Sequence, residues 1–550
     1  MSTQDFIKFS VCDILKKGIG SSSSHTLAPW RSAQACYNTL ITGGWLQDLT
    51  AVTVTLYGSL AFVGRGHYTT VAIPLGLLGE DVMTFDISTG LEAALGIASV
   101  TDIGSLDSLT YSGGQTVSYG LIFNTLQDTD QEKMVFAFTY KSGTASEGRP
   151  DVLTYYSYGG GSYGTSPTLQ PSYSNLNALP YMYDSAEQLM SLLDKKHLDT
   201  GTISEATFLN EIAYAEYRKK YPDPTMAGLP TDEPGIISYL KGIAVQMGQL
   251  IYDGCTYDDN DDCYKIMYAQ PRAKKLYNDL IGQDAGVQDW QAFFERVYQK
   301  SRDFSFDQII ELVSIFALAV SEQNSALKHV VTAPTNGSCG TVPAVLYYYV
   351  IFHASEEERT WLYGDSSGIG LNDILRFLLT ASTVGGIVKN NANISGGVGG
   401  CQAEVGTSAA MAAGGLADVL GDLSPVIALN AAEAALEDQL GSTCDPIGGL
   451  VEIPCIDRNL AASVTAITLS REMTQLGASY ISTVPFDKAV EAMEDISMDM
   501  SDKYKETSTG GLALVMQEDV EQKRPDLFPP TPLLKAERAK QKISIFRTTC

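Results

Sequence analysis

Three cysteines stand at positions where their thiols could act together as metal ligands. Cys401 follows a run of glycines, Cys444 precedes an Asp-Pro turn, and Cys455 follows Pro454. Each lies at the edge of an expected helix, where thiols can converge, whereas a thiol inside a helix usually packs as a small apolar group. Cys455 also lies near the positive end of its helix, which favours the thiolate that binds metal.

The residues by themselves leave two interpretations of these thiols open. Most free cysteines are inert buried residues. A closed zinc site is not supported, because no CxxC or His-rich pair accompanies them. Three thiolates do suit an iron–sulfur cluster with one iron left open as a Lewis acid.

Helices are expected on both sides of the cysteines. Residues 404–420 are rich in Ala, Gly, Ser and Met, small or flexible side chains that predict a helix deep in a core. Residues 431–440 form a second expected helix that ends at Gly441, and residues 455–476 form a third.

A second group of candidate residues lies near the N-terminus. Residues 18–26 read GIGSSSSHT, between an expected helix at 5–17 and another at 28–39 with Pro29 in its first turn. A Gly/Ser loop at a helix N-terminus offers N–H groups and hydroxyls to an anion such as a carboxylate. The spacing alone favours the simpler alternative, an ordinary capping loop.

Two further turns carry residues that could do chemistry. A strand expected at 51–57 leads to the GRGH turn that ends at His67, and an imidazole can act as acid or base near neutral pH. Thr335, Asn336 and Ser338 lie in the turn APTNGSCG, where they could bind a small polar ligand or cap the following helix. A lone histidine after a turn is most often a surface or capping residue.

Composition and charge limit the class of protein. The 550 residues are 44% hydrophobic and 18% charged, as expected of a folded protein with a sizeable core. The net charge of -27 opposes nucleic acid and anionic membranes as partners. We expect a cytoplasmic protein, because no signal peptide and no long apolar run occurs, and nine cysteines suit a reducing compartment.

The chain is expected to be an α+β protein of two domains. Strand-like runs occur at 115–126, 133–141 and 152–161, whereas apolar residues three and four apart dominate after residue 180. We therefore predict an N-terminal α/β domain at 1–165 that carries the substrate loops, and a linker at 166–180. A mainly α catalytic domain at 181–535 and a tail at 536–550 follow. The sequence leaves open whether the sheet is a scaffold, a regulatory unit or a dimer surface.

Several long motifs in order resemble one family. They are APTNGSCGTVPAVLYY at 333–348, GGCQAEVG at 399–406, TCDPIGG at 443–449, EIPCIDRN at 452–459, and the N-terminal GSSSSHT and GSLAFVGRGH. Together they resemble the iron–sulfur L-serine dehydratases, and the resemblance covers most of the chain. It implies a 4Fe-4S cluster held by Cys401, Cys444 and Cys455, and elimination of water from L-serine to give pyruvate and ammonia.

The resemblance also implies roles for other residues. His67 is the implied acid/base, Arg458 would balance negative charge, and Cys339 would line the pocket wall. The residues that would orient the substrate are Ser22, Ser23, Ser24, His25, Thr335 and Asn336. The chain departs from the family pattern where Ser21 replaces a proline, Arg65 a lysine and Val398 an acidic residue.

The basic tail ends in Cys550. Some relatives end similarly and fold the tail back onto the cluster. Our hypothesis is that Cys550 is a self-inhibitory fourth ligand of the open iron, with Lys540, Lys542 and Arg547 docking on an acidic surface.

Two other functions fit parts of the sequence. A pyridoxal-phosphate-dependent serine or threonine dehydratase would use Lys389 for the Schiff base and residues 396–400 as the phosphate cradle, but it leaves the three cysteines unexplained. An inactive amino-acid sensor would use the N-terminal domain alone. On general grounds we expect a homodimer.

Overall fold

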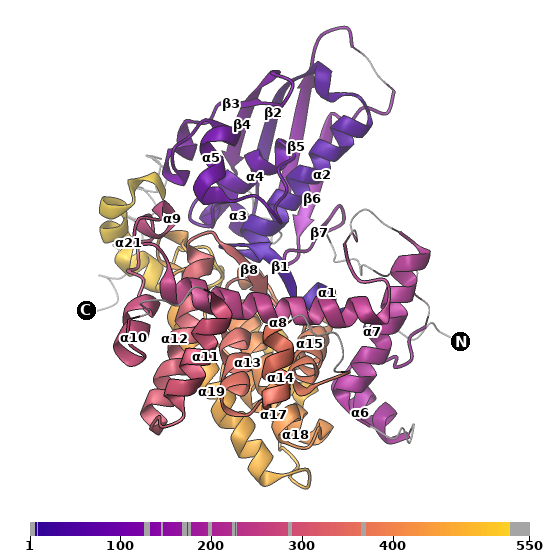
Figure 1. Ribbon diagram of the computed structural model, residues 1–550. Coiled ribbons are helices and arrows are strands. Elements are labelled where there is room, and N and C mark those ends of the chain that lie inside the picture. Colours follow the sequence, from indigo (N-terminus) through magenta and orange to yellow (C-terminus); the bar gives the residue numbers. More distant parts are fainter. Residues whose placement is uncertain are drawn as a thin grey trace, which may run out of the picture.

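The computed structural model describes residues 6–7, 9–125, 132–144, 147–167, 173, 176, 178–195, 201–222, 226, 228–283, 289–364 and 370–527. A mixed sheet with its helices lies at one end of the molecule and a larger body of helices at the other (Figure 1). This arrangement confirms the α+β prediction. The predicted domain boundaries at 165 and 180 stay a prediction.

The sheet has six strands in the order β3-β4-β2-β5-β6-β7. Its central strand β2 (Leu49–Leu56) runs parallel to β4 (Thr116–Phe123) and antiparallel to β5 (Lys133–Tyr140). The outer strands are β3 (Ser108–Thr110), β6 (Val152–Ser157) and β7 (Tyr163–Gly164). Alternate residues of β5 are buried, which is the pattern of a sheet covered on one face. The three strand-like runs of the sequence are thereby confirmed.

Helices cover that buried face of the sheet (Figure 1). They are α2 (Ala28–Thr42), α4 (Thr69–Leu77) and α5 (Ile87–Leu95), with the short α3 (Ser59–Val63) at the end of β2. Trp30 of α2 is fully buried in the core that these helices share with the strands. The helix expected at 28–39 is confirmed, with Pro29 in its first turn.

The first residues of the chain pack on the helical body. Only Val11–Ile14 is helical (α1), and Lys16–Ile19 forms a strand, β1, that pairs antiparallel with β8 (His329–Thr332). The helix expected at 5–17 is therefore wrong for the described residues of that segment. The backbone groups of residues 16–19 bond to a strand more than 300 residues away, which no local pattern could indicate.

The helical body is built around α17 (Thr407–Leu420). Every residue from Thr407 to Asp418 is buried, so the predicted deep helix of small residues is confirmed. The elements that pack against α17 are α13 (Thr341–Phe352), α15 (Asp373–Asn391), α18 (Pro425–Glu437) and α19 (Cys455–Leu476). The α19 helix has the predicted bounds, whereas α18 begins six residues before the predicted 431 because Pro425 suits a first turn.

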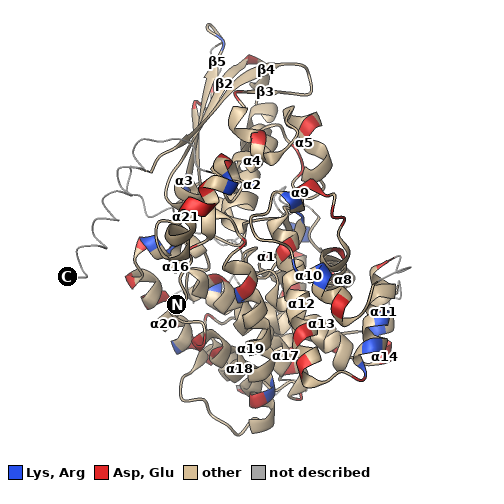
Figure 2. Cartoon of the chain, turned by 90° about the vertical axis from the view of Figure 1, so that its left-hand side faces the viewer, with Lys and Arg blue, Asp and Glu red and all other residues tan. Residues whose placement is uncertain are grey.

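The other described helices surround this centre. They are α6 (Ala186–Lys195), α7 (Ile203–Lys220), α8 (Glu233–Thr256), α9 (Asp262–Lys265), α10 (Ala273–Leu280), α11 (Trp290–Ser301), α12 (Phe306–Ser325), α14 (Glu356–Tyr363), α16 (Gly396–Gly399), α20 (Phe486–Asp499) and α21 (Gly511–Lys523). Among the described residues, no helix combines the length and the apolar run needed to cross a bilayer. Acidic and basic residues lie scattered over both parts in the view of Figure 2, without one basic patch.

Candidate active site

The three cysteines of the sequence prediction lie on three separate loops or helix ends. Cys401 lies between α16 and a π-helical turn at Gln402–Gly406, and Cys455 is the first residue of α19. Cys444 lies on a loop whose backbone pairs with the segment 504–506. All three side chains are buried, with exposed fractions of 2%, 2% and 6% for Cys401, Cys444 and Cys455.

The three thiols lie within range of one another's charge. Burial, then the charge of Glu506, and then Cys455 and Cys401 raise the pKa of the Cys444 thiol well above its ordinary value. Burial also raises the pKa of Cys401, while the Arg458 guanidinium beside it lowers that pKa. Three buried thiols beside one cation are groups that can bind a metal, because a bound metal favours the thiolate form.

Two sets of buried side chains lie close enough together to hold a metal ion. Among the described residues, the sets of three ligand atoms that lie within 4.8 Å of one another are His25, His67 and Glu506, and Glu404, Cys444 and Glu506. The three cysteines do not form such a set. Their three sulfurs therefore do not all lie within 4.8 Å of one another.

Arg458 lies in the first turn of α19, next to the thiols. Its guanidinium donates a hydrogen bond to the carbonyl oxygen of Thr443 and lies 3.7 Å from Asp445 Oδ1. Cys401, Cys455 and Cys444 all raise the pKa of Arg458, against its desolvation. Arg458 therefore lies beside the three thiols, and its role in balancing negative charge stays a prediction.

Two buried histidines face one carboxyl group. The rings of His25 and His67 lie 4.7 Å apart between centroids, and both side chains are fully buried. His67 Nε2 lies 2.8 Å from Glu506 Oε1, and His25 Nδ1 lies 3.6 Å from Glu506 Oε2. The loop at residues 20–27 and the turn after α3 thereby meet a segment from the far end of the chain.

The surroundings of His67 fix which nitrogen is basic. Its Nδ1 lies 3.3 Å from the carbonyl oxygen of Val63, which can only accept a hydrogen bond, so Nδ1 carries the proton of the neutral ring. Burial lowers the pKa of His67 to about 4, against the charge of Glu404, which keeps the ring neutral at pH 7. Nε2 is then the basic nitrogen, and the proton in its contact with Glu506 comes from the carboxyl group, whose pKa burial raises to about 8.

The backbone of Glu506 aims its carboxyl group. Glu506 has a φ of +50°, in the left-handed region that non-glycine residues seldom adopt. Cys444 N–H donates to the Tyr504 carbonyl at 2.7 Å, and Glu506 N–H donates to the Cys444 carbonyl at 2.7 Å. The same short ladder therefore positions a candidate metal ligand and the carboxyl group that contacts His67.

The Ser-rich loop at residues 20–27 forms another side of the site. Ser22 caps the π-helical turn Ser23–Leu27 by accepting from His25 N–H. His25 Nδ1 lies 2.7 Å from Ser24 Oγ, and its Nε2 lies 2.8 Å from Ser59 Oγ. Ser21 Oγ and Ser23 Oγ are buried without a hydrogen-bond partner among the described residues. Such unsatisfied hydroxyls are costly unless a ligand or water contacts them.

Thr335 and Asn336 lie in the turn between β8 and α13, and both are buried. Asn336 Nδ2 donates to the Ile19 carbonyl at 2.6 Å, while its Oδ1 has no partner in the described part of the chain. A hydrogen bond from Thr335 lowers the pKa of Glu404. Cys339 lies in the same turn with an exposed fraction of 1%. Burial raises the pKa of its thiol, and the charge of Glu404 raises it further.

Three buried carboxyl groups of the site were missed from the sequence. Burial and the charge of Glu506 raise the pKa of Glu404 to about 8, and the same two causes raise that of Glu132 to about 7. Glu132 Oε1 accepts from Ser59 Oγ at 3.2 Å and from Ser395 Oγ at 2.7 Å. An isolated Glu carries no signal of this kind, although Glu404 lies within the quoted GGCQAEVG motif.

The glycines before Cys401 contact these carboxyl groups and not a phosphate. A Cβ at Gly396 would lie 2.8 Å from Glu404 Oε2, and one at Gly397 would lie 2.4 Å from Glu132 Oε1. Glycine is needed there because the carboxyl oxygens approach the backbone closely. Carboxyl oxygens occupy the space beside Gly396 and Gly397, which argues against a phosphate cradle there and against the pyridoxal-phosphate alternative.

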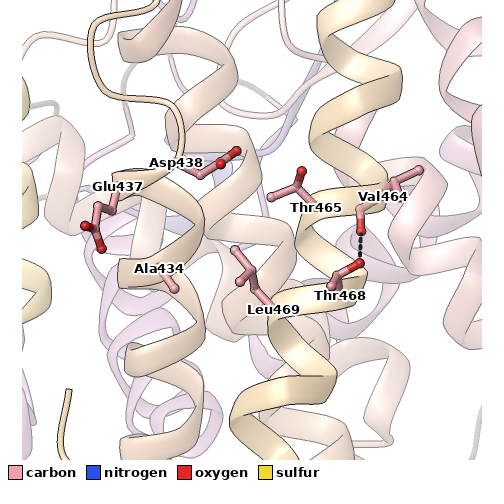
Figure 3. A pocket seen from close by; sticks show the side chains of 7 residues that line it. All are labelled: Ala434, Glu437, Asp438, Val464, Thr465, Thr468 and Leu469. Atoms are coloured by element: carbon pink, nitrogen blue, oxygen red, sulfur yellow. Dashed lines mark hydrogen bonds between the residues drawn. The ribbon is translucent and has the colours of Figure 1, made fainter.

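Other predictions fall outside this site. Cys550, Lys540, Lys542 and Arg547 lie outside the described residues. A hollow of about 480 Å³ lies between α18 and α19 (Figure 3). Its lining contains none of the predicted site residues and consists of Ala434, Glu437, Asp438, Val464, Thr465, Thr468 and Leu469.

Comparisons with known proteins agree with this arrangement. A family model described as serine dehydratase beta chain matches residues 10–166, and one described as serine dehydratase alpha chain matches residues 227–513. L-serine dehydratase TdcG of Escherichia coli is 34% identical over 516 residues, which cover 92% of this chain and 98% of that protein. An L-serine dehydratase of Mycobacterium tuberculosis is 35% identical over 517 residues, covering 92% and 97%.

A third relative, the L-serine dehydratase of Haemophilus influenzae, is 34% identical over 519 residues, covering 92% of this chain and 98% of that protein. The similarity extends over the sheet, the helical body and all three cysteine loops. The chain therefore belongs to the serine dehydratase family, with its beta-chain and alpha-chain regions joined in one polypeptide.

Proposed function

We propose that this protein is an L-serine dehydratase that removes water from L-serine by α,β-elimination, and that it uses a 4Fe-4S cluster bound by Cys401, Cys444 and Cys455. The product aminoacrylate then hydrolyses through its imine to pyruvate and ammonia. The observation that carries the proposal is the convergence of three buried thiols and a His67–Glu506 pair in one site.

The residues fit such a cluster. Three buried thiols are the ligand type that holds iron–sulfur clusters, and Arg458 beside them would offset negative charge. Three protein ligands leave one iron without a protein side chain. When bound, the cluster supplies a Lewis acid that polarises the C–O bond of the substrate hydroxyl group.

His67 is the proposed base. Its Nδ1 faces the Val63 carbonyl and its Nε2 carries the lone pair, so the ring is oriented to take the α-proton at Nε2. The lowered pKa of His67 keeps the ring neutral at pH 7, and the Glu506 carboxyl group that contacts Nε2 at 2.8 Å would have to give up that contact before Nε2 takes a proton. The site is also closed to water, because His25, His67 and the serines of the loop are all buried.

The unsatisfied polar atoms match the two ends of an amino-acid zwitterion. Ser21 Oγ and Ser23 Oγ can donate to a carboxylate, whereas Glu506 Oε2, Glu132 Oε2 and Asn336 Oδ1 can accept from an ammonium group. Of these acceptors, Glu506 Oε2 lies 3.6 Å from His25 Nδ1. Ser22, Ser24, His25 and Thr335 hold the surrounding loops in place. We propose that this set orients the substrate.

The test is iron and acid-labile sulfide content of anaerobically purified protein, with a visible spectrum before and after L-serine and an assay of pyruvate. About four of each per chain, a broad absorbance that L-serine changes, and pyruvate formation are expected. Iron-free yellow protein with a band that borohydride removes would instead indicate pyridoxal phosphate. We also expect a cytoplasmic homodimer, and light scattering measures its mass.

A further inference from the structure

We propose that Lys16, Arg31 and Lys389 form a second binding site, for a small oxyanion such as a carboxylate or phosphate group, against the backbone of residues 159–162. This site lies at the junction of the sheet and the helical body. It is separate from the thiols, histidines and carboxyl groups described above, and its test does not depend on the proposed function.

Lys389, in the last turn of α15, is the most buried of the three cations, with an exposed fraction of 6%. Its Nζ lies 3.3 Å from Ser162 Oγ and 3.5 Å from the Asp13 carbonyl oxygen, both at the outer limit of hydrogen bonding. It also lies 4.8 Å from the centre of the Phe9 ring. These partners are neutral, so they leave a buried positive charge without a counter-charge in contact.

Arg31 contacts the same loop, and Lys16 lies close enough for the charges of Lys389 and Arg31 to act on it. Arg31 Nη1 donates to the Gly161 carbonyl at 3.3 Å, and Lys16 projects from β1 opposite Thr332. Both side chains are half-buried. Among the described residues, none of the three cations has a carboxylate oxygen within 4.0 Å.

The charges nearby do not balance the cluster. Burial, followed by the charges of Lys389 and Arg31, lowers the pKa of Lys16 well below its ordinary value, and Asp13 opposes this shift. Burial lowers the pKa of Arg31, and Tyr163, Tyr239 and then Asp81 oppose this shift. Both carboxylates act at longer range than an ion pair. An anion in contact with the cations would remove the repulsion that the free protein tolerates.

The loop at 159–162 allows a ligand and the cations to come close. Gly159, Gly160 and Gly161 have φ values of +83°, +58° and +71°. A Cβ at Gly160 would lie 3.8 Å from Lys389 Nζ and 3.1 Å from the Pro334 carbonyl oxygen. Any side chain at Gly160 would therefore crowd the space between the cation and the turn that carries Thr335.

The same loop contacts the candidate active site on its other side. Ser157 Oγ donates to the Ser24 carbonyl at 2.9 Å, and a Cβ at Gly159 would lie 3.3 Å from the Ser395 side chain. An anion held by the three cations would thus stabilise the backbone that supports Ser24 and Ser395. Three unpaired cations are also unusual in a protein with 64 acidic and 37 basic residues.

Thermal unfolding of the full chain tests the site. Melting temperature is measured with increasing inorganic phosphate, with acetate in a second series, and with chloride at equal ionic strength as the reference. The variants are Lys16→Gln and Lys389→Gln, and the matched control is Lys17→Gln, because Lys17 is the exposed neighbour of Lys16 on the same strand.

We expect phosphate or acetate to raise the melting temperature of the wild type and of Lys17→Gln by several degrees, and the rise to fall by more than half in Lys16→Gln and Lys389→Gln. Which of the two anions acts tells a phosphate ligand from a carboxylate ligand. No rise in the wild type, or an equal rise in all four proteins, overturns the proposal. If Lys389→Gln does not fold, Lys16→Gln and its control still decide the question.

Discussion

The two sides of the loop at 159–162 differ in the sign of their buried charge. On one side, Glu132, Glu404 and Glu506 surround the histidines and thiols; on the other, Lys16, Arg31 and Lys389 gather without a carboxylate in contact. Burial shifts the pKa of the groups on each side towards the neutral form. The protein thus keeps two sets of buried polar groups on the two sides of residues 159–162. Burying each set costs free energy, and a ligand of opposite charge suits each set.

The strongest test of the acidic side removes the proposed base. His67→Asn is expected to lower kcat by about 10²- to 10⁴-fold, the range for loss of general acid–base catalysis. Iron content and melting temperature should change little, because the asparagine keeps a polar group in the same turn. A variant that keeps most of its activity would remove His67 from the reaction.

A buried carboxyl group that belongs to neither set measures the cost of burial. Glu211 accepts from Ser10 Oγ and from the Val11 N–H, both at 2.7 Å, and burial raises its pKa from 4.5 to about 7. The folded state therefore binds more protons than the unfolded state between these values, so Glu211 makes stability fall as pH rises through this window. Glu211→Gln should remove up to about 3 kcal/mol of that fall, measured by urea unfolding from pH 4.5 to 7.5. An unchanged pH dependence would show that Glu211 ionises normally.

Two variants of Glu506 test its contact with His67. Glu506→Ala should lower kcat by about 10- to 100-fold, as expected when the partner that orients a functional histidine is lost. Glu506→Gln should retain more activity, because its amide can still donate to Nε2. Since Glu506 contacts Cys444 through its backbone, both variants should keep their iron content. Equal losses in the two variants would show that the carboxyl group does more than orient the ring.

The smallest expected effect lies on the basic side. Lys16→Met, which removes one of three mutually repelling cations, should leave stability unchanged or raise it by about 1 kcal/mol. The control Lys17→Met changes an exposed side chain and should have an effect within about 0.5 kcal/mol. Urea unfolding without added anion measures both. A clear loss of stability in Lys16→Met would mean that this ammonium group is already satisfied in the free protein.

The sequence predicted what local patterns encode. The bounds of α19 follow from Pro454 and the apolar spacing, and the burial of α17 follows from its small residues. The positions of Cys401 and Cys455 beside helices could be predicted for the same reason, whereas Cys444 lies on a loop. The glycines and prolines around them mark where each helix must begin or end.

Long-range pairing explains what the sequence could not predict. Glu506 is separated by 439 positions from His67, and its orientation depends on a left-handed backbone that the ladder with Cys444 maintains. Residues 16–19 have no alternation that separates a strand from a helix, and β8 decides their conformation. The surroundings of Glu132 and Lys389 likewise come from neighbours in space and not in sequence.

The pairing of β1 with β8 has a consequence for cutting the chain in two. The region similar to a beta chain, residues 10–166, includes β1, whereas β8 belongs to the region similar to an alpha chain, residues 227–513. A break between residues 166 and 180 would leave each fragment with half of an antiparallel ribbon in a fixed register. The fragments would therefore carry their own means of reassembly, in which the first residues of one complete the fold of the other.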